Sequence, residues 1–399
     1  TSFVYNSFGS LVETIHPDGT SDIFNLNWCK PGPSVPNYAT YASTQFTLPF
    51  GSEDKWNEKS VYYDAYGRKL RETVKNIQGK VIYNDYEYNL EGQLERVYEP
   101  YYIADGKGLF TMYRYDELGR LIETILPDKS IDNITYLGRK TLTSRTKGDI
   151  NITDETVVNI MGDTDMKKDA VMTINYNYDG KRRLRQTYVG TSVTEITYDE
   201  AGNRSQLIDP NAGTITYAFN AFGELTSQTD ANGNNTKLTY IDGRTDQKVI
   251  TSNGATLTYN YTYYLLNSDN GFGQIASESC SNGTSVSYNY DELGRIAQKS
   301  ETINQNIFTF GYTYNSASGM PETYTYPSGF KLKYAYNQRG DMTGISGFFG
   351  SYWAGLWTGY LQNQRGQWAQ HQTPAGVTTL QYDNFGFPSQ TVSQKSLGN

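Results

Sequence analysis

The chain has 399 residues, and its 34 Lys and Arg against 42 Asp and Glu give a net charge of −8. This balance provides no general attraction to a polyanion, so we expect no nucleic-acid partner. Aromatic residues make up 14% of the chain, which is too many for a disordered polypeptide.

The scarcity of Cys and His excludes several kinds of site. Cys29 and Cys280 cannot form a disulfide framework, and His16 and His371 both stand just before turns that contain proline. A nucleophile needs a base within hydrogen-bond reach, and no motif supplies such a pair. We therefore predict no enzyme, no catalytic, cofactor-binding or metal residues, and no cofactor.

One short phrase recurs from the first residues to the last. It reads aromatic, any residue, aromatic, Asp or Asn, two residues, Gly and a polar residue, as at 113–120 and 288–295. Further full copies centre on Tyr63, Tyr88, Tyr198, Phe219, Tyr336 and Tyr382, and looser ones on Tyr5, Tyr178, Tyr240, Tyr314 and Gln362. Together they make about thirteen copies of one unit.

The unit has the pattern of a β-hairpin. The copies at 198, 219 and 240 are about 21 residues apart, which is too short for a helix pair. Two aromatic residues separated by one position share a face of a strand, and Asp/Asn-x-x-Gly is typical of a tight turn. A second turn with Pro or Asn and Gly, as at 17–19 and 327–329, closes the unit.

These features predict an all-β fold. Because one hairpin is only marginally stable, the hairpins must lie side by side in a continuous, curved or spiralling antiparallel sheet, with each tyrosine packed on the neighbouring unit. Thirteen units correspond to about 26 strands.

The repeated Tyr-Asp-x-x-Gly-Arg phrase resembles the YD-repeat (Rhs-type) family of bacterial Rhs proteins, Tc toxin B and C components, and teneurins. The resemblance implies a sheet that forms part of a hollow shell. In Rhs and Tc proteins the shell holds a C-terminal toxin, and in teneurins it is an extracellular adhesion scaffold. We expect residues 1–399 to be a single array within a longer protein, secreted or at the cell surface, with flanking repeats and a toxin domain as partners.

The chain also departs from the toxin carriers. They end their arrays at an Asp-Pro autoproteolytic site, whereas Asp209-Pro210 lies in an ordinary turn between repeats. Two other functions therefore stay open. One is an adhesion module that binds proteins or glycans at a cell surface through exposed Tyr and Trp rings; the other is a hydrolase on a β-propeller.

The stretch 24–56 interrupts the first repeats. It contains Pro31, Pro33, Pro36 and Pro49 among aromatic residues that include Trp28, Tyr38, Tyr41, Phe46, Phe50 and Trp56. Proline cannot donate to a β-ladder, so this Pro/aromatic-rich insertion is predicted as an irregular loop that caps the sheet or docks a partner.

The stretch 140–172 is predicted as an irregular repeat, because it has no clear Tyr-Asp copy. Asp163 and Asp165 resemble the start of a calcium loop, but Lys167 occupies the next ligand position. The segment 230–234 fails similarly, because Asn235 stands where a calcium loop needs Gly and Ile241 stands where it needs Glu, so no calcium site is expected.

The stretch 342–364 is an uncharged repeat rich in Gly and aromatic residues. Five glycines argue against a membrane span, and the phrase Asn-Gln-Arg-Gly on both sides, at 337–340 and 363–366, marks one long repeat. We predict a hairpin with its tip near 349–351, which serves packing or a sticky surface.

Overall fold

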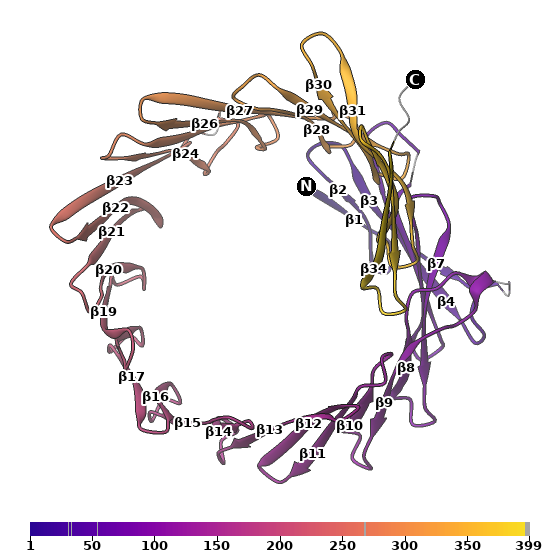
Figure 1. Ribbon diagram of the computed structural model, residues 1–399, viewed down its shortest axis with the longest axis horizontal. Coiled ribbons are helices and arrows are strands. Elements are labelled where there is room, and N and C mark those ends of the chain that lie inside the picture. Colours follow the sequence, from indigo (N-terminus) through magenta and orange to yellow (C-terminus); the bar gives the residue numbers. More distant parts are fainter. Residues whose placement is uncertain (31, 33, 54, 267–268, 396–399) are drawn as a thin grey trace. The chain divides into compact units, whose positions relative to one another are not determined.

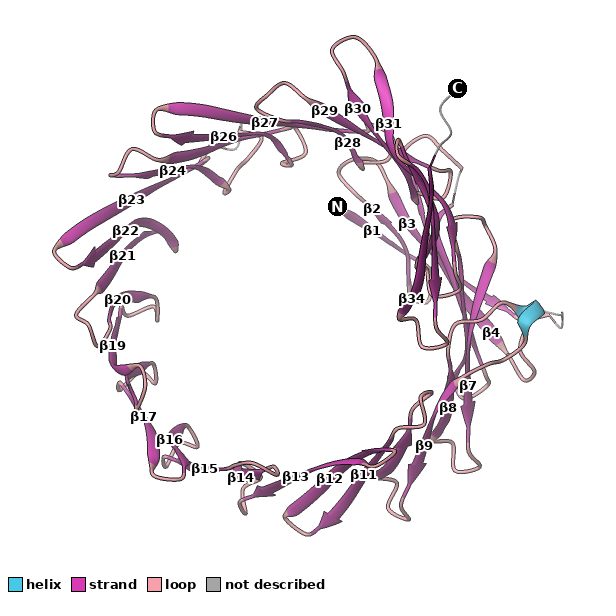
Figure 2. Cartoon of the chain, in the orientation of Figure 1, coloured by secondary structure: helices cyan, strands magenta, loops and turns pink. Residues whose placement is uncertain are grey.

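The computed structural model describes residues 1–30, 32, 34–53, 55–266 and 269–395. These residues contain 34 β-strands and one 3-10 turn, η1 (Ile103–Asp105), and no α-helix (Figure 2). The predicted all-β fold is confirmed. Contacts divide the chain into unit 1 (Thr1–Arg120, Thr124–Lys129 and the described part of Phe310–Asn399) and unit 2 (Leu121–Glu123 and Ser130–Thr309).

Unit 1 contains the first nine and the last seven strands. They are β1 (Ser2–Tyr5), β2 (Leu11–Ile15), β3 (Ser21–Trp28), β4 (Tyr41–Leu48), β5 (Trp56–Tyr63), β6 (Lys69–Lys75), β7 (Val81–Tyr88), β8 (Leu94–Tyr98), β9 (Phe110–Tyr115), β28 (Pro321–Thr325), β29 (Lys331–Tyr336), β30 (Met342–Phe348), β31 (Trp353–Gln362), β32 (Trp368–Thr373), β33 (Gly376–Tyr382) and β34 (Pro388–Lys395).

Unit 2 contains the middle of the array. Its strands are β11 (Ile131–Leu137), β12 (Lys140–Lys147), β13 (Ile150–Val158), β14 (Thr164–Lys168), β15 (Thr173–Tyr178), β16 (Leu184–Val189), β17 (Ser192–Tyr198), β18 (Arg204–Asp209), β19 (Gly213–Phe219), β20 (Leu225–Thr229), β21 (Asn235–Ile241), β22 (Arg244–Ser252), β23 (Ala255–Tyr263), β24 (Ile275–Cys280), β25 (Ser285–Tyr290) and β26 (Ile296–Ile303). Two strands, β10 (Leu121–Ile125) and β27 (Asn306–Tyr314), have residues in both units.

Strands pair antiparallel with their neighbours along the chain in three runs. The pairs run from β1–β2 to β8–β9, from β11–β12 to β25–β26, and from β27–β28 to β33–β34. Figure 1 shows β11–β26 as one curved layer of strands. The described residues form more than the predicted 26 or so strands, because the stretches expected to be irregular are also strands.

Each segment of the repeated phrase has a structural role, which Asp116 illustrates. Its Oδ1 accepts hydrogen bonds from the backbone N–H of Leu118 at 3.0 Å and of Arg120 at 2.9 Å, and its Oδ2 accepts one from Arg120 Nε at 2.8 Å. Gly119 has a φ of 78°, a left-handed backbone conformation that is unfavourable for residues with a Cβ. The Asp, Gly and Arg of the phrase therefore define one closed turn.

The stretch 140–172 is regular, contrary to the prediction. It forms β12, β13 and β14, and the turn between β13 and β14 is a repeat copy that the sequence analysis missed. Asn159 Oδ1 accepts hydrogen bonds from the N–H of Met161 and of Asp163. The copy was missed because Val158 replaces the tyrosine before the turn.

The tyrosine before the turn bonds to the preceding repeat. Asn289 lies opposite Gln298 while Tyr290 lies opposite Ile296, so the return strand carries a one-residue bulge. Tyr290 Oη donates to the backbone carbonyl of Ile275 at 2.9 Å. We call this bond the tyrosine latch. Within the described residues the latch joins Tyr88 to Lys69, Tyr115 to Leu94, Tyr136 to Leu121, Tyr178 to Thr164, Tyr198 to Leu184, Tyr240 to Leu225, Tyr263 to Thr245, Tyr290 to Ile275, Tyr336 to Pro321 and Tyr382 to Trp368.

Deep burial is concentrated in unit 1. The buried apolar residues are Phe46, Ile77, Ile82, Tyr83, Tyr98 and Tyr101 in unit 1 and Cys280 in unit 2. In unit 2 a strand such as β19 alternates between half-buried and exposed residues along its length. Its half-buried face carries the aromatic residues, as expected for a sheet with one covered face.

The stretch 24–56 differs from the irregular loop that its prolines predicted. β3 and β4 pair over eight residues each, from Ser21 opposite Leu48 to Trp28 opposite Tyr41. Pro36 and Pro49 lie outside these strands, so the ladder loses no donor. Pro31 and Pro33 lie outside the described residues.

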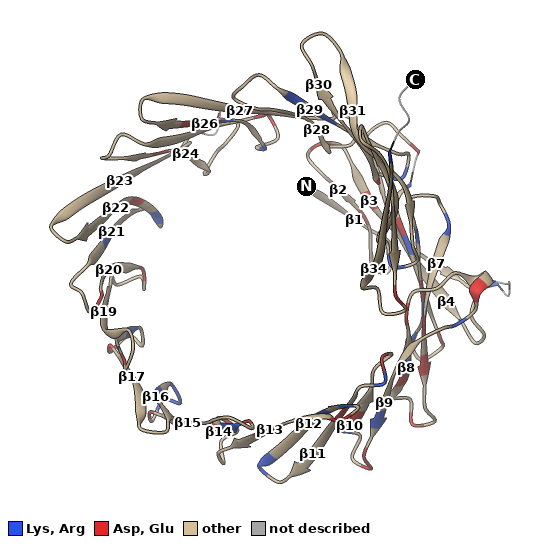
Figure 3. Cartoon of the chain, viewed as in Figure 1, with Lys and Arg blue, Asp and Glu red and all other residues tan. Residues whose placement is uncertain are grey.

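The stretch 342–364 forms β30 and β31, which carry no charged residue (Figure 3). The turn between them is closed by the N–H of Phe349 donating to the carbonyl of Tyr352 at 2.9 Å. A Cβ on Gly347 would lie 2.8 Å from the ring of Phe330, so this glycine provides space for that ring. None of the helical segments in the described ranges is long and apolar enough to cross a membrane.

Removing one latch should destabilise unit 2 by about 1 kcal/mol, the usual net value of a hydrogen bond. In Tyr198→Phe the ring remains but the bond to the Leu184 carbonyl is lost. The measurement is the free energy of unfolding in denaturant. Phe219 holds the same place in its repeat and lacks a hydroxyl. Phe219→Tyr should therefore raise the free energy of unfolding. Equal stability of Tyr198→Phe and the parent would contradict an energetic role for the latch.

Candidate functional site

The two histidines are not arranged as catalytic bases. His16 Nε2 lies 3.0 Å from Asp22 Oδ2, and Thr47 Oγ1 donates to Asp22 Oδ1 at 2.6 Å. The carboxylate thus stands between the imidazole and the hydroxyl, whereas nucleophile activation needs the imidazole beside the hydroxyl. The His371 ring packs near Trp357, with centroids 6.2 Å apart. The sequence analysis missed the pairing of His16 with Asp22.

The acidic segments considered for calcium are used in other contacts. Arg182 forms an ion pair with Asp163 at 2.5 Å, and Asp230 accepts hydrogen bonds from Asn232 and Asn234 within its own turn. Within the part of the chain that the structure describes, no three His, Cys, Asp or Glu side chains form a group that could hold a metal ion. In the Asp209-Pro210 segment, Asp209 Oδ1 accepts from the N–H of Asn211 and of Ala212, as in an ordinary turn.

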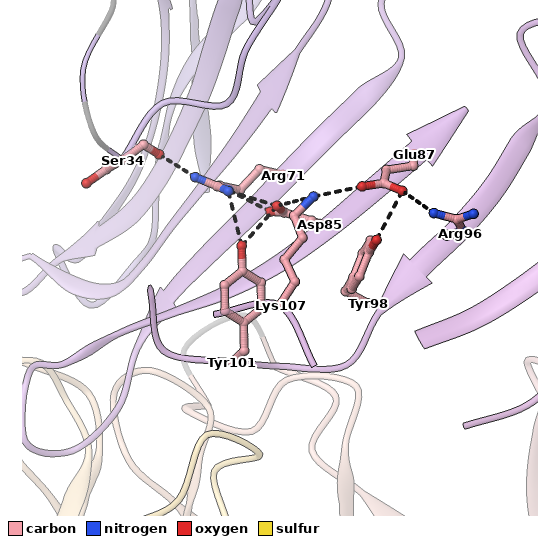
Figure 4. A network of polar contacts seen from close by, with 8 residues as sticks. All are labelled: Ser34, Arg71, Asp85, Glu87, Arg96, Tyr98, Tyr101 and Lys107. Carbon is pink, nitrogen blue, oxygen red and sulfur yellow. Dashed lines mark hydrogen bonds and ion pairs between the residues drawn. The ribbon is translucent and has the colours of Figure 1, made fainter. Parts of the chain in front are cut away.

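A polar cluster with a buried centre lies on β6 and β7 (Figure 4). Arg71 and Asp85 are cross-strand neighbours and form a bidentate pair, with Nε to Oδ1 at 2.6 Å and Nη2 to Oδ2 at 2.8 Å. Only 7% of Arg71 and 3% of Asp85 is exposed. Arg71 Nη1 also donates to the Ser34 carbonyl at 2.9 Å. The pair therefore joins β6 and β7 to the loop before β4.

Residues 99–109, between β8 and β9, complete this cluster, and we call them the strap. Tyr101 Oη donates to Asp85 Oδ2 at 2.9 Å, and the backbones of Tyr101 and Tyr83 form a two-way bridge. Lys107 Nζ lies 3.2 Å from Asp85 Oδ2 and 2.9 Å from Glu87 Oε1. The strap is thus held on the sheet at both of its ends.

The surroundings fix the protonation states of the cluster. Burial tends to raise the pKa of Asp85, but the hydrogen bonds and charge of Arg71 outweigh it and hold that pKa below its usual value. The pKa of Glu87 is also lowered, since the hydrogen bond and charge of Lys107 outweigh burial. Burial and the Asp85 charge raise the pKa of Tyr101 to about 12. An acid–base catalyst needs a pKa near the operating pH. These shifts instead move the pKa values of Asp85, Glu87 and Tyr101 further from neutral pH.

A polar cleft of about 600 Å³ lies beside the cluster. Its wall includes Tyr38 from the loop before β4 and Asp85, Glu87 and Lys107 from the cluster. The carboxylates in the wall already have cationic partners within the chain. The arrangement therefore acts as an ionic lock that fixes the strap on the sheet.

The other side of the strap contacts the end of the array. Arg365 Nη2 lies 3.3 Å from Glu99 Oε2, and Tyr102 Oη donates to the Gln362 carbonyl at 3.4 Å. Asn76 Nδ2 donates to Tyr102 Oη at 2.9 Å, which connects the strap to the turn between β6 and β7. Residues more than 250 positions apart in sequence thus lie side by side within unit 1.

The turn at 76–80 makes a second set of distant contacts. The carbonyl of Ile77 accepts hydrogen bonds from Arg339 and from Asn337 Nδ2, and its N–H donates to Gln362 Oε1 at 3.2 Å. Gln78 Nε2 donates to the Tyr360 carbonyl at 2.8 Å. We call the strap, this turn and the segments 337–341 and 360–367 the clasp.

The clasp explains the two identical Asn-Gln-Arg-Gly phrases. Arg339 and Arg365 hold the same position in their turns, where other copies have Tyr66, Leu118 or Phe222. Both arginines reach the first repeats, one at Ile77 and the other at Glu99. The two phrases predicted only the length of one repeat, and the contacts of their arginines were not predicted.

The ionic lock should make unit 1 sensitive to acid. Since the pKa of Asp85 is lowered on folding, its stabilising effect is present above about pH 4 and is lost as the pH falls through the lowered pKa. Asp85→Asn should cost about 3–5 kcal/mol at neutral pH, because it leaves Arg71 buried without its partner. The free energy of unfolding of this variant should also depend less on pH between about 4 and 2 than that of the parent.

Asp105→Asn, on the exposed turn η1, is the matched control and should leave the acid profile unchanged. Parallel acid profiles for Asp85→Asn and the parent would contradict the ionic lock.

Comparison with known proteins gives one family and one fold. The family model described as the teneurin YD-shell matches residues 264–346. A sequence search of curated proteins finds no match.

Three solved structures share the fold of the chain. The TcdB2-TccC3-Cdc42 structure has a TM-score of 0.74 at 15% identity, over 91% of this chain and 22% of that one. TcdB2-TccC3 has a TM-score of 0.72 at 15% identity, over 98% and 26%. A Tc holotoxin pore of Photorhabdus luminescens, mutated in TccC3, has a TM-score of 0.73 at 14% identity, over 90% and 21%.

The chain spans about a quarter or less of the length of these solved chains. Its recurrent Tyr-Asp-x-x-Gly turns, its ladder of hairpins and the match at 264–346 agree with the resemblance seen in the sequence. Residues 264–346 thus match the teneurin YD-shell family, and the chain as a whole shares the fold of the solved Tc structures.

Proposed function

We propose that the chain forms part of the wall of a YD-repeat shell and acts as a structural, non-enzymatic segment of a secreted or cell-surface protein. In the full-length protein the wall encloses a linked C-terminal toxin polypeptide. Flanking repeats of the same polypeptide complete the shell.

The observation that carries this proposal is the ladder of latched hairpins. Paired strands satisfy backbone groups on one another, and each latch joins a tyrosine to a main-chain carbonyl of the preceding repeat, as Tyr198 does to Leu184. A sheet of this kind extends by adding repeats and needs no second layer over unit 2. The fold likeness to Tc structures supports the same role.

The electrostatics of the buried cluster support a structural role. The pKa shifts of Asp85, Glu87 and Tyr101 stabilise the ion pairs and leave no group poised to exchange a proton near neutral pH. The cluster therefore serves to hold the strap and the clasp.

The proposal predicts that the full-length gene product contains further repeats and a divergent C-terminal domain that proteases cannot reach. In limited proteolysis followed by mass spectrometry, this domain should stay intact while the array is folded. It should be cleaved once denaturant unfolds the array. The isolated domain serves as the control. A gene product without such a domain, or a domain cleaved equally fast in both states, would contradict the proposal.

An adhesion function has one feature in its favour, a partly exposed group of aromatic rings in unit 1. We call it the aromatic platform: Phe310, Tyr312, Tyr324, Tyr326, Phe330, Phe349 and Tyr352. Successive ring centroids lie between 4.6 and 6.1 Å apart. Tyr352 is 60% exposed. Flat aromatic rings can stack on the C–H face of a sugar, and β30 and β31 carry no charge, so a neutral glycan is the fitting ligand.

If the platform binds glycans, neutral polysaccharides in an affinity gel should slow the migration of the chain. Tyr352→Ala should weaken this retardation about 5-fold, because it removes the most exposed ring of the platform. Tyr66→Ala, an equally drastic change at an exposed turn outside the platform, should have no effect. Migration that is unaffected by every polysaccharide would eliminate the glycan alternative.

A further inference from the structure

The turns between β5 and β9 lie along two rims of the sheet. The YD turn at 64–67 joins β5 to β6, and the next turn, at 76–79, joins β6 to β7 at the opposite end of β6. Because consecutive strands are antiparallel, the YD turns share one rim, and the turns between repeats share the other. We call these edges the YD rim and the linking rim. The strap, which follows β8, belongs to the linking rim.

The clasp shows what a YD rim contacts in this protein. Two YD turns of the last repeats, which carry Arg339 and Arg365, lie against the linking rim of the first repeats. Arg339 donates to the carbonyl of Ile77, and Arg365 forms an ion pair at 3.3 Å with Glu99 of the strap. Ile77 is among the few buried apolar residues of unit 1. A YD rim therefore packs on a linking rim and buries an apolar side chain there.

Three other YD turns of unit 1 carry exposed, bulky apolar side chains. They follow β5, β7 and β9, and the residues are Tyr66, Leu90 and Leu118. Between 78% and 102% of each residue is exposed. Neighbouring YD turns are two strands apart, which is about 10 Å. Single exposed apolar residues are ordinary on a protein surface, but a row of them in successive repeats is typical of an interaction surface.

We propose that this apolar row, Tyr66, Leu90 and Leu118, is the surface on which flanking YD repeats of the same polypeptide dock through their linking turns. The inference rests on the proposed function, which assigns further repeats to the full-length protein, and it adds the surface that they contact. The contact joins a YD rim to a linking rim, as the clasp does within unit 1. Its partner is a linking turn that presents an apolar residue, as the turn at 76–79 presents Ile77.

The residue type in the turn separates the clasp from the apolar row. Arg339 and Arg365 need acceptors at fixed places, because a guanidinium group donates its hydrogen bonds in a rigid geometry. The row buries apolar surface instead, and this gain in free energy does not depend on direction. The row consequently fits linking turns of different sequence, whereas each arginine fits one partner.

The test is hydroxyl-radical footprinting of the 399-residue chain and of the full-length gene product. Tyr66 and Leu118 should be oxidised about 5-fold more slowly in the full-length product, because their side chains leave solvent at the contact. Leu26 is the control, since it is 70% exposed on β3 and not on a YD turn, and it should react equally in both proteins. Equal oxidation of Leu118 in the two proteins overturns the proposal, and so does equal protection of Leu26 and Leu118.

A charge placed in the row provides a second measurement. Leu90→Asp should leave the free energy of unfolding of the 399-residue chain unchanged, because Leu90 is fully exposed there. In the full-length product the same change should restore fast oxidation of Leu118, since a carboxylate is costly to bury in an apolar contact. Leu26→Asp should not restore it. Full protection of Leu118 in the Leu90→Asp product overturns the proposal.

The outcomes separate this inference from the proposed function. A full-length product whose C-terminal domain resists proteases while Leu118 stays reactive overturns the docking surface and leaves the shell wall standing. A gene that encodes no further repeats overturns both.

Discussion

The fold depends on the hydrogen bond from a tyrosine hydroxyl to a main-chain carbonyl of the preceding repeat. A single hairpin buries little apolar surface, and in unit 2 Cys280 is the one apolar residue among the described ones that is deeply buried. The tyrosine ring covers the neighbouring strands while its hydroxyl satisfies a polar backbone group, as Tyr240 does at Leu225. The tyrosine side chain thus buries apolar surface and also fixes the position of its strand relative to the preceding repeat.

Unit 1 adds a second kind of stabilisation, because its distant segments contact one another. The Arg71–Asp85 pair is buried and fully hydrogen-bonded, and removing one partner of such a pair is costly. Within the clasp, Tyr101 of the strap bonds to Asp85 of this pair, and Tyr102 bonds to Gln362 in the segment 360–367. The local ladder and the long-range clasp are therefore separate sources of stability in one molecule.

Sequence alone was enough for the all-β fold and the turn chemistry, because both depend on local patterns. Sequence patterns missed the repeat copy at 158–163, because Val158 replaces the usual tyrosine although the turn keeps its geometry. They also failed at 41–48, where prolines in the connections concealed a regular strand. The clasp could not be predicted from local patterns, since the contact of Arg339 with Ile77 joins residues 262 positions apart in sequence. For the same reason the pairing of Arg71 with Asp85 was missed, although both are charged residues in predicted strands.

The acceptor of every latch is a carbonyl oxygen, which all twenty amino acids carry. The first residue of the return strand can consequently be Lys69, Thr164, Pro321 or Trp368 without loss of the bond. A repeat can then be duplicated, deleted or exchanged by recombination, and its new neighbour needs no compensating mutation. Arrays of this design can change length readily during evolution, except at the two arginine turns of the clasp, where the partners are fixed.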